Sequence, residues 1–184
     1  MGGHVDQILG LIKIAVVFAL LFGLPIGGVV AFVFMRAKKR KEERAAPWGA
    51  LAEKWSGSFD GDRVVCERAG HKLVLDVQMV SVMQASSSPY WSDGGTFTRA
   101  QLSAPRAVAK VAKPTRVSFG QVADLVPAAK QLPGDAVIVL EPNGAAVVLD
   151  GSVTDHAQLE LAFSVLFGLF EVSESAPFSV APPA

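Results

Sequence analysis

The stretch that decides the fold is Ala136–Phe170, AVIVLEPNGAAVVLDGSVTDHAQLELAFSVLFGLF. Its first half holds two apolar runs, Ala136–Leu140 and Ala145–Leu149, on either side of the tetrapeptide EPNG. Proline presets φ for a turn, and an Asn-Gly pair accepts a positive φ, so these residues predict a tight turn. The two runs are therefore predicted to be the paired strands of a β-hairpin.

The second half predicts an apolar helix. Ser152 or Thr154 is expected to cap it, and the charge of Asp155 suits the positive end of the helix dipole. A helix that is apolar nearly all round is buried or lies in a membrane, and Leu161–Phe170 is too short to span one. The apolar residues that recur at helical spacing are Leu159, Leu161, Phe163, Val165, Leu166, Phe167, Leu169 and Phe170.

We predict that this helix packs across an antiparallel sheet. The alternatives are partial insertion at a membrane interface and burial against a partner protein. In either alternative, Phe163 and Phe167 are the candidate contact residues. The segment that follows, 173–184, contains three prolines and is expected to be a flexible tail.

Residues 58–113 have the pattern of strands. Runs rich in valine and leucine, separated by turn residues, predict a hairpin and two further strands. In the second strand, Leu73, Leu75, Val77 and Met79 are expected to share one face, with Lys72, Val74, Asp76 and Gln78 on the other. The predicted strands are Arg63–Glu67, Lys72–Met83, Thr96–Ser103 and Ala107–Ala112.

Two further segments predict helices. Residues 119–131 indicate a helix or helical turn that Pro127 disturbs, and residues 45–56 indicate a short amphipathic helix with Pro47 in its first turn. Trp48 and Trp55 are expected to pack on the core, with interfacial anchoring in a membrane as the alternative. The predicted fold is α+β, with a mainly antiparallel sheet of about six strands and two to three helices.

The N-terminal part contains an uncharged run of 22 residues, Ile14–Met35. As a helix it would be about 33 Å long, enough to cross a hydrocarbon core of about 30 Å. We therefore predict a single transmembrane helix with a kink near Pro25. Gly23 and Gly27 form a GxxxG pair, which we attribute to this kink rather than to a dimer face. A cleaved signal peptide, the alternative, would place its basic residues before the run.

Basic residues follow the run directly and predict its orientation. The positive-inside rule places this flank in the cytoplasm, so we expect a cell-membrane protein with its N-terminus outside and its domain cytoplasmic. A site for acidic lipids or nucleic acid is the alternative, which Glu42 and Glu43 weaken. The basic residues are Arg36, Lys38, Lys39, Arg40, Lys41 and Arg44. The predicted organisation is a tail at 1–13, a span at 14–35, a basic linker at 36–46, an α+β domain at 47–172 and a tail at 173–184.

Charge and cysteine content limit the function classes. Residues 45–184 hold 10 of the 17 basic and 14 of the 17 acidic residues, so the domain carries about four net negative charges. That balance argues against a nucleic-acid partner, because phosphate binding needs a basic face. A single cysteine, Cys66, allows no internal disulfide and fits a reducing cytoplasm. Without Cys/His clusters at zinc spacing, no metal or other cofactor is predicted.

The sequence holds none of the common catalytic or nucleotide-binding motifs. Cys66 and His71 lie on opposite arms of the predicted hairpin, but a cysteine among alternating valines is typical of a small buried hydrophobe, so no catalytic residue is predicted. Tyr90 and Trp91 lie in a polar loop, where aromatic side chains are favoured at interfaces. The alternative is that this loop folds back on the core.

These patterns predict the function only in outline. We expect a membrane-anchored accessory or scaffolding protein, with the lipid bilayer and an unidentified partner protein as its partners. Tyr90, Trp91, Phe163 and Phe167 are its candidate contacts. The alternative is a membrane-tethered enzyme or small-ligand module without a linear motif. A deep pocket with converging polar groups would favour the alternative, and a flat apolar patch would favour the first interpretation.

Overall fold

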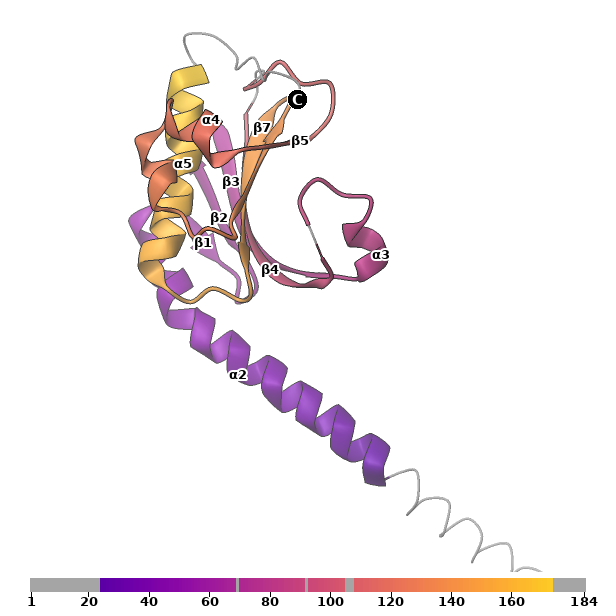
Figure 1. Cartoon of the computed structure of the whole chain (residues 1–184). Helices are drawn as coiled ribbons and strands as arrows, with labels where there is room; N and C mark the ends of the chain where they lie inside the picture. Colours follow the sequence, from indigo (N-terminus) through magenta and orange to yellow (C-terminus); the bar gives the residue numbers. More distant parts are fainter. Residues whose placement is uncertain (1–23, 69, 92, 105–107, 174–184) are drawn as a thin grey trace, which may run out of the picture. The chain divides into compact units, whose positions relative to one another are not determined.

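The computed structural model of the chain describes residues 24–68, 70–91, 93–104 and 108–173. Its backbone contacts divide the chain into two compact units, Met1–Glu42 and Glu43–Ala184. Every strand of the described residues belongs to the second unit (Figure 1). The predicted α+β class is confirmed, with four α-helices and one 3-10 helix in the described residues.

Helix α2 (Leu24–Lys54) contains both the basic residues and the segment that was expected to form a separate short helix. Alanine, lysine, arginine and glutamate fill the middle of α2, and all four are strong helix formers. Pro47 lies inside the helix, although it has no backbone N–H to donate to the preceding turn. The expected helix start at Ala45 is therefore wrong, and residues 36–46, expected as a linker, are helical.

The predicted membrane span, Ile14–Met35, lies only partly in the described residues, because 14–23 fall outside them. Among the helices of the described residues, none is both long enough and apolar enough to cross a bilayer. The part of α2 before the basic residues exposes large apolar side chains, namely Val29, Val30, Phe32, Val33, Phe34 and Met35.

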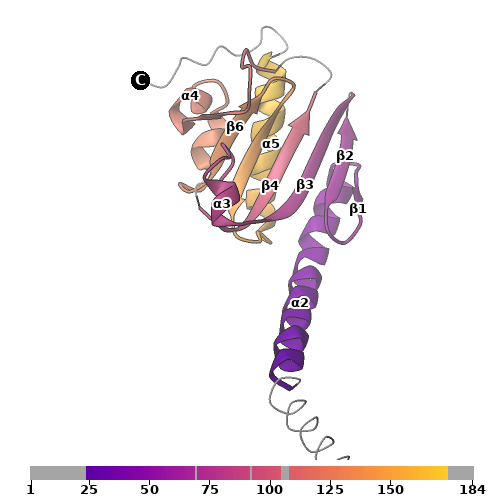
Figure 2. The ribbon, with the colours of Figure 1, turned by 90° about the vertical axis from the view of Figure 1, so that its right-hand side faces the viewer.

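The second unit is built on one antiparallel sheet, as predicted, with seven strands in the described residues rather than about six. The strand order is β1-β2-β3-β4-β7-β6-β5, so the last hairpin is inserted between β4 and β5. Figure 2 shows β2, β3 and β4 side by side. The strands are β1 (Ser58–Phe59), β2 (Val64–Arg68), β3 (His71–Val80), β4 (Gly95–Ser103), β5 (Thr115–Val117), β6 (Val137–Glu141) and β7 (Gly144–Asp150).

Strands β2 and β3 form the predicted hairpin. Strand β3 ends before the predicted Met83, because Ser81 and Gln84 form a capping box that starts the short helix α3 (Val82–Ala85). Of the residues expected to share one face of this strand, Leu73 and Leu75 are buried, whereas Met79 is 82% exposed. Alternation along a strand predicts which face a residue occupies, but not where the element covering that face ends.

The predicted strand Ala107–Ala112 is wrong for its described residues, which form only an isolated bridge. The backbone N–H of Val108 donates to the carbonyl of Pro142 over 3.1 Å instead of joining a ladder. The strand in this region, β5, comes after Pro114 and pairs with β6. A proline directly before a short strand at the sheet edge costs no hydrogen bond of the ladder.

The predicted hairpin of β6 and β7 is confirmed, with Glu141 paired to Gly144 across a two-residue turn. Neither Asn143 nor Gly144 has a positive φ, so the expected use of the Asn-Gly pair is wrong. Gly144 is required for space instead. A Cβ at this position would lie 2.3 Å from the carbonyl oxygen of Leu102 on β4.

Proline also splits the predicted helix at 119–131 into two pieces. Helix α4 (Phe119–Ala123) begins with a capping box between Ser118 and Gln121. The 3-10 helix η2 (Pro127–Gln131) begins at the proline itself. Because proline cannot donate a backbone hydrogen bond, the first helix ends before it.

Helix α5 (His156–Ser173) follows the last strand. The side chain of Asp155 accepts a hydrogen bond from the backbone N–H of Ala157 over 2.9 Å. Asp155 therefore caps the helix, and the expectation that Ser152 or Thr154 does so is wrong.

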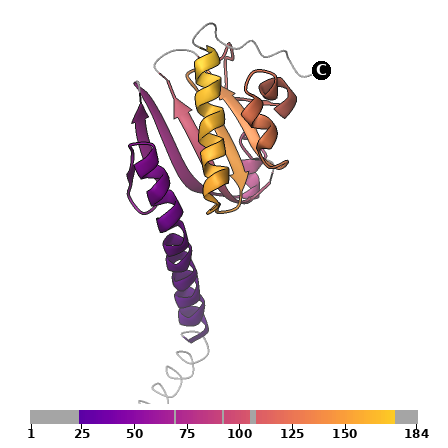
Figure 3. The ribbon, with the colours of Figure 1, turned by 90° about the vertical axis from the view of Figure 1, so that its left-hand side faces the viewer.

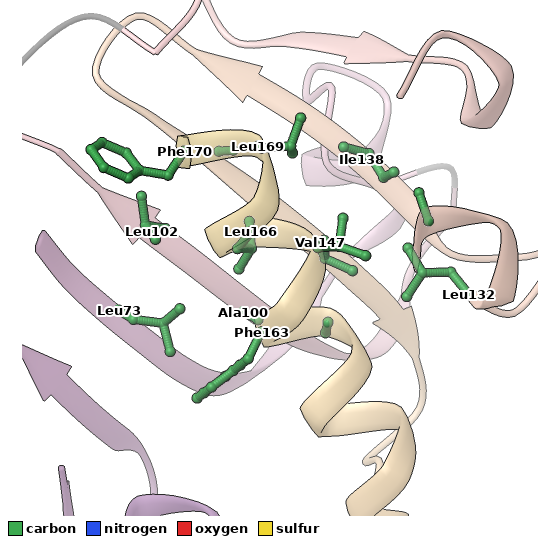
Figure 4. Packing of buried hydrophobic residues seen from close by; sticks show 14 of the residues in the cluster. Leu73, Ala100, Leu102, Leu132, Ile138, Val147, Phe163, Leu166, Leu169 and Phe170 are labelled. Carbon is green, nitrogen blue, oxygen red and sulfur yellow. The ribbon is translucent and has the colours of Figure 1, made fainter. Parts of the chain in front are cut away.

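Helix α5 crosses one face of the sheet, with α4 and η2 beside it (Figure 3). Phe163, Leu166 and Leu169 lie against sheet residues that include Leu73, Leu102 and Val147 (Figure 4). Phe163 is completely buried, and so are most of the apolar residues of the helix. The prediction that this helix packs on the sheet as part of the core is confirmed.

The end of α2 is part of the same core. Trp48 is completely buried, and its Nε1 donates to the carbonyl of Val153 over 3.0 Å. Trp55 packs edge-on against Phe163 at 5.5 Å and stacks on Phe167 at 4.9 Å. Core packing of the two tryptophans is confirmed.

An ion pair adds to the contact between α2 and α5. Lys54 pairs with the carboxylate of Glu160, and His156 Nε2 lies 2.8 Å from the same carboxylate. The hydrogen bond from Lys54 is the main cause that lowers the pKa of Glu160. Together with the buried tryptophan, this pair ties the last turns of α2 to the domain.

Candidate functional site

The loop between β3 and β4 lies on the face of the sheet opposite α5, here called the outer face (Figures 1 and 2). On this face Val139, Ala146 and Val148 are at most 2% exposed, although they do not belong to the main core cluster. Strands β6 and β7 are therefore covered on both faces, which fits their continuous apolar sequence. The loop, residues 81–94 with residue 92 outside the described part, contacts this face through Tyr90 and Trp91.

Tyr90 fastens this loop to the sheet. Its hydroxyl donates a hydrogen bond to Glu141 Oε1 over 2.5 Å, and Gln101 Nε2 donates to the two oxygens of the same carboxylate over 2.9 and 3.1 Å. Burial, and then the hydrogen bond to Glu141, raise the pKa of Tyr90. The tyrosine is thus held in its protonated, donating form.

Trp91 packs beside it. Its ring centroid lies 5.1 Å from that of Phe97 on β4 and 5.9 Å from that of Tyr90. The structure therefore brings the two candidate contact residues of the loop together, both half-buried on the outer face. The loop folds back on the sheet, on the face away from the main core.

A polar network occupies the neighbouring part of the outer face. Arg99 donates from Nε and Nη2 to the carboxylate of Asp76, over 3.2 and 2.9 Å. Gln78 donates to the same carboxylate over 2.7 Å. These bonds satisfy the two charges within the sheet, so this pair forms part of the scaffold rather than a reactive centre.

A cleft of about 690 Å³ opens between the loop and the β5–β6 end of the sheet. Its volume falls in the range of about 300–1,000 Å³ that is typical of ligand sites. Its floor and walls are apolar and aromatic, and its rim carries charged side chains. The lining residues are Tyr90, Asp93, Gly94, Phe97, Arg116, Val117, Ser118, Phe119, Gly134, Asp135, Ala136, Val137, Val148 and Asp150.

Negative charge dominates the rim of the cleft. Asp93, Asp135 and Asp150 are exposed, and within the described residues their side chains form no hydrogen bond or ion pair. The single cationic side chain, Arg116, donates from Nε to the carbonyl of Pro89 over 3.2 Å. The three carboxylates lie in separate segments, and no group of three metal-ligating side chains comes together among the described residues.

The other candidate contact residues lie elsewhere. Phe163 is completely buried in the core, and the half-buried Phe167 stacks on Trp55, both on the sheet face that α5 covers. They therefore contribute no surface to the cleft on the opposite face.

The basic residues of the predicted membrane flank lie on α2. Five of them, from Arg36 to Lys41, are exposed. Within the first unit, Arg36 lies over the ring of Phe32 at 5.3 Å, and Lys38 is 3.9 Å from Glu42. Arg44, in the second unit, is half-buried over the ring of Trp48 at 5.3 Å.

Cys66 and His71 do not form a reactive pair. Cys66 is opposite Leu73 in the β2–β3 ladder and is 2% exposed. Burial raises the pKa of its thiol, which disfavours the nucleophilic thiolate. The ring of His71 packs on Phe170 with 3.8 Å between centroids. Cys66 is therefore a small buried hydrophobic residue, as the sequence analysis favoured.

Sequence reasoning missed most of the cleft. Glu141 was interpreted only as a turn residue. Asp93 and Asp135 lie in turns and Asp150 ends β7, and the three share no motif. One signal was available: β6 and β7 are apolar without alternation, which is typical of strands covered on both faces. That pattern predicts a cover on the outer face, but not which loop supplies it.

Comparison of the chain with protein-family models, with curated proteins and with solved structures finds no match.

Proposed function

We propose that the chain is a single-pass membrane protein whose cytoplasmic domain is a non-enzymatic adapter, and that the outer-face cleft holds a partner protein. The observation that carries this proposal is the cleft, with an aromatic wall and a rim of carboxylates that are unpaired within the described residues. Unpaired charges beside an apolar floor are suited to recognition, because a partner can satisfy both.

The groups in the cleft support binding rather than catalysis. The hydroxyl of Ser118 is engaged with Gln121 in its own capping box, at 3.0 Å, so no base activates it. Tyr90 is committed to Glu141 and is held protonated. A small-ligand module is the second candidate, and the volume of the cleft favours it.

Photocrosslinking in native membranes tests the adapter. Gly134 lies at the rim, and a Cβ there would meet nothing within 4 Å, so it accepts a photoreactive side chain. Glu53 is exposed on α2, on the opposite side of the sheet, and serves as the control position. A discrete protein adduct from position 134 and none from position 53 is expected. The absence of a protein adduct from position 134 would contradict the adapter and would favour a small-ligand module.

The membrane anchor rests on the uncharged run Ile14–Met35 and the basic residues that follow it. Protease added to sealed inside-out vesicles is expected to digest the domain, while intact cells protect it. Protection of the domain inside inverted vesicles would contradict the proposed orientation. Loss of the run from the mature chain, detected by mass spectrometry, would instead indicate a cleaved signal peptide.

A further inference from the structure

We infer that the outer-face cleft recognises a cationic segment of the partner, with a lysine or arginine side chain inserted between the aromatic wall and the acidic rim. This inference rests on the proposed adapter function and names the chemistry of its partner. It follows from three features of the cleft: the sign of its charge, the nature of its wall and its accessibility.

The cleft carries more negative than positive charge. The cleft is lined by three carboxylates and one guanidinium, and that guanidinium already donates to Pro89. The carboxylates of Asp93, Asp135 and Asp150 have no cationic partner within the described residues, so the cleft presents a net negative surface. The domain as a whole has four more acidic than basic residues beyond Ala45, which favours the approach of a cation.

The wall adds a second preference for cations. Tyr90, Phe97 and Phe119 line the cleft with aromatic rings. A ring face attracts an ammonium or guanidinium group, and the apolar stem of lysine or arginine packs well on such a surface. An anionic group would meet both the negative rim and the negative ring faces.

The carboxylates are also spread around the rim rather than gathered at one point. They belong to the β3–β4 loop, to the turn before β6 and to the end of β7. Because they do not converge, they suit several positive charges along a segment better than one compact ion. A basic, extended stretch of a partner protein matches this spacing, and it is the occupant that the cleft favours.

Binding of an acetylated hexa-arginine peptide to the full chain in zwitterionic detergent, measured by titration calorimetry, tests the inference. Gly134→Lys places a competing cation at the rim, and Gly49→Lys makes the same change of charge on α2, where a Cβ also meets nothing within 4 Å. We expect Gly134→Lys to weaken binding at least about tenfold and Gly49→Lys less than about twofold. Equal weakening by both variants would show non-specific charge attraction and would overturn the inference.

Two double substitutions remove charge at exposed positions, where a change of side chain does not disturb the core. Asp93→Asn combined with Asp135→Asn acts in the cleft, and Glu53→Gln combined with Glu171→Gln makes the same change of net charge elsewhere. The first pair is expected to weaken binding about tenfold and the second to leave it unchanged. No difference between the two pairs would overturn the inference.

Two further results distinguish a free amine from a protein segment as the source of the cation, and the adapter function from the cationic nature of its partner. Spermine that binds as tightly as hexa-arginine, with the same loss in Gly134→Lys, would indicate a free amine and would overturn a protein segment as the occupant. A protein adduct from position 134 without any binding of hexa-arginine would leave the adapter intact while overturning its cationic partner.

Discussion

The hydroxyl of Tyr90 and the carboxylate of Glu141 are joined by a hydrogen bond of 2.5 Å between residues that lie 51 positions apart. Glu141 is the last residue of β6, and Tyr90 belongs to the loop on the outer face. Gln101 holds the same carboxylate from β4. This single carboxylate thus connects the loop, the β6–β7 hairpin and the centre of the sheet.

Removing the hydroxyl should loosen the loop. Tyr90→Phe keeps the ring beside Trp91 but loses the bond to Glu141, and bonds to charged groups contribute about 1.5–3 kcal/mol. Because Tyr90 is half-buried, we expect the free energy of unfolding in urea to fall by about 1.5 kcal/mol, with faster hydrogen exchange in residues 81–91. A loss under about 0.5 kcal/mol, which is typical of surface changes, would contradict this role.

The pH dependence follows from the same bond. Tyrosine has an ordinary pKa of about 10, and burial beside Glu141 raises the pKa of Tyr90 in the folded protein. The folded state therefore holds the proton more tightly than the unfolded state. The resulting stability is fully present below pH about 10 and is lost as pH rises from there through the folded pKa.

Absorbance of the tyrosinate measures this directly, because Tyr90 is the only tyrosine of the chain. In the folded wild type, we expect ionisation to begin well above pH about 10. Glu141→Gln removes the negative charge, so its Tyr90 should ionise at a lower pH than that of the wild type. Identical titration curves for the two proteins would show that Glu141 does not influence Tyr90.

The core side of the sheet gives a prediction that ranks two phenylalanines. Phe163 is completely buried, so Phe163→Ala should leave a cavity and cost about 3–5 kcal/mol in urea unfolding. Phe167 is only half-buried against Trp55, so Phe167→Ala should cost less. If Phe167→Ala is the more damaging change, then the contact with Trp55 contributes more than burial does.

The sequence predicts the parts of the fold that have a local pattern and not the parts that depend on tertiary contacts. Alternation and turn residues predict both hairpins, and continuous apolar periodicity predicts α5, because each pattern is local. Residues 108–112 fail because Val108 donates its N–H to the β6–β7 turn, a tertiary contact with no local pattern. For the same reason, the rim of the cleft could not be predicted, because Asp93, Asp135 and Asp150 line one cleft only through the strand order.

Two glycines should respond to alanine with opposite signs. A Cβ at Gly144 would lie 2.3 Å from the carbonyl oxygen of Leu102, so Gly144→Ala forces β7 away from β4 and should cost about 1–3 kcal/mol. Gly49 lies inside α2 with nothing within 4 Å of a Cβ, so Gly49→Ala should stabilise by about 0.5–1 kcal/mol. Thermal unfolding of the two variants checks both signs, and a stabilised Gly144→Ala would contradict the close approach of the two strands.

The last prediction concerns where the folded domain begins. The second unit starts at Glu43, and the final turns of α2 bring Trp48, Leu51 and Ala52 into the core. A chain that begins at Glu43 should therefore fold by itself, with a cooperative urea transition and an α+β circular dichroism spectrum.

A shorter chain that begins at Ser58 is the matched control. It keeps every strand of the described residues but loses Trp48 and Trp55, and the ring of Trp55 packs on Phe163. Removing one large buried side chain already costs about 3–5 kcal/mol, and natural domains are stable by only about 5–15 kcal/mol, so this chain should not fold. If both chains fold equally well, the end of α2 is not part of the core; if neither folds, the domain depends on the residues before Glu43.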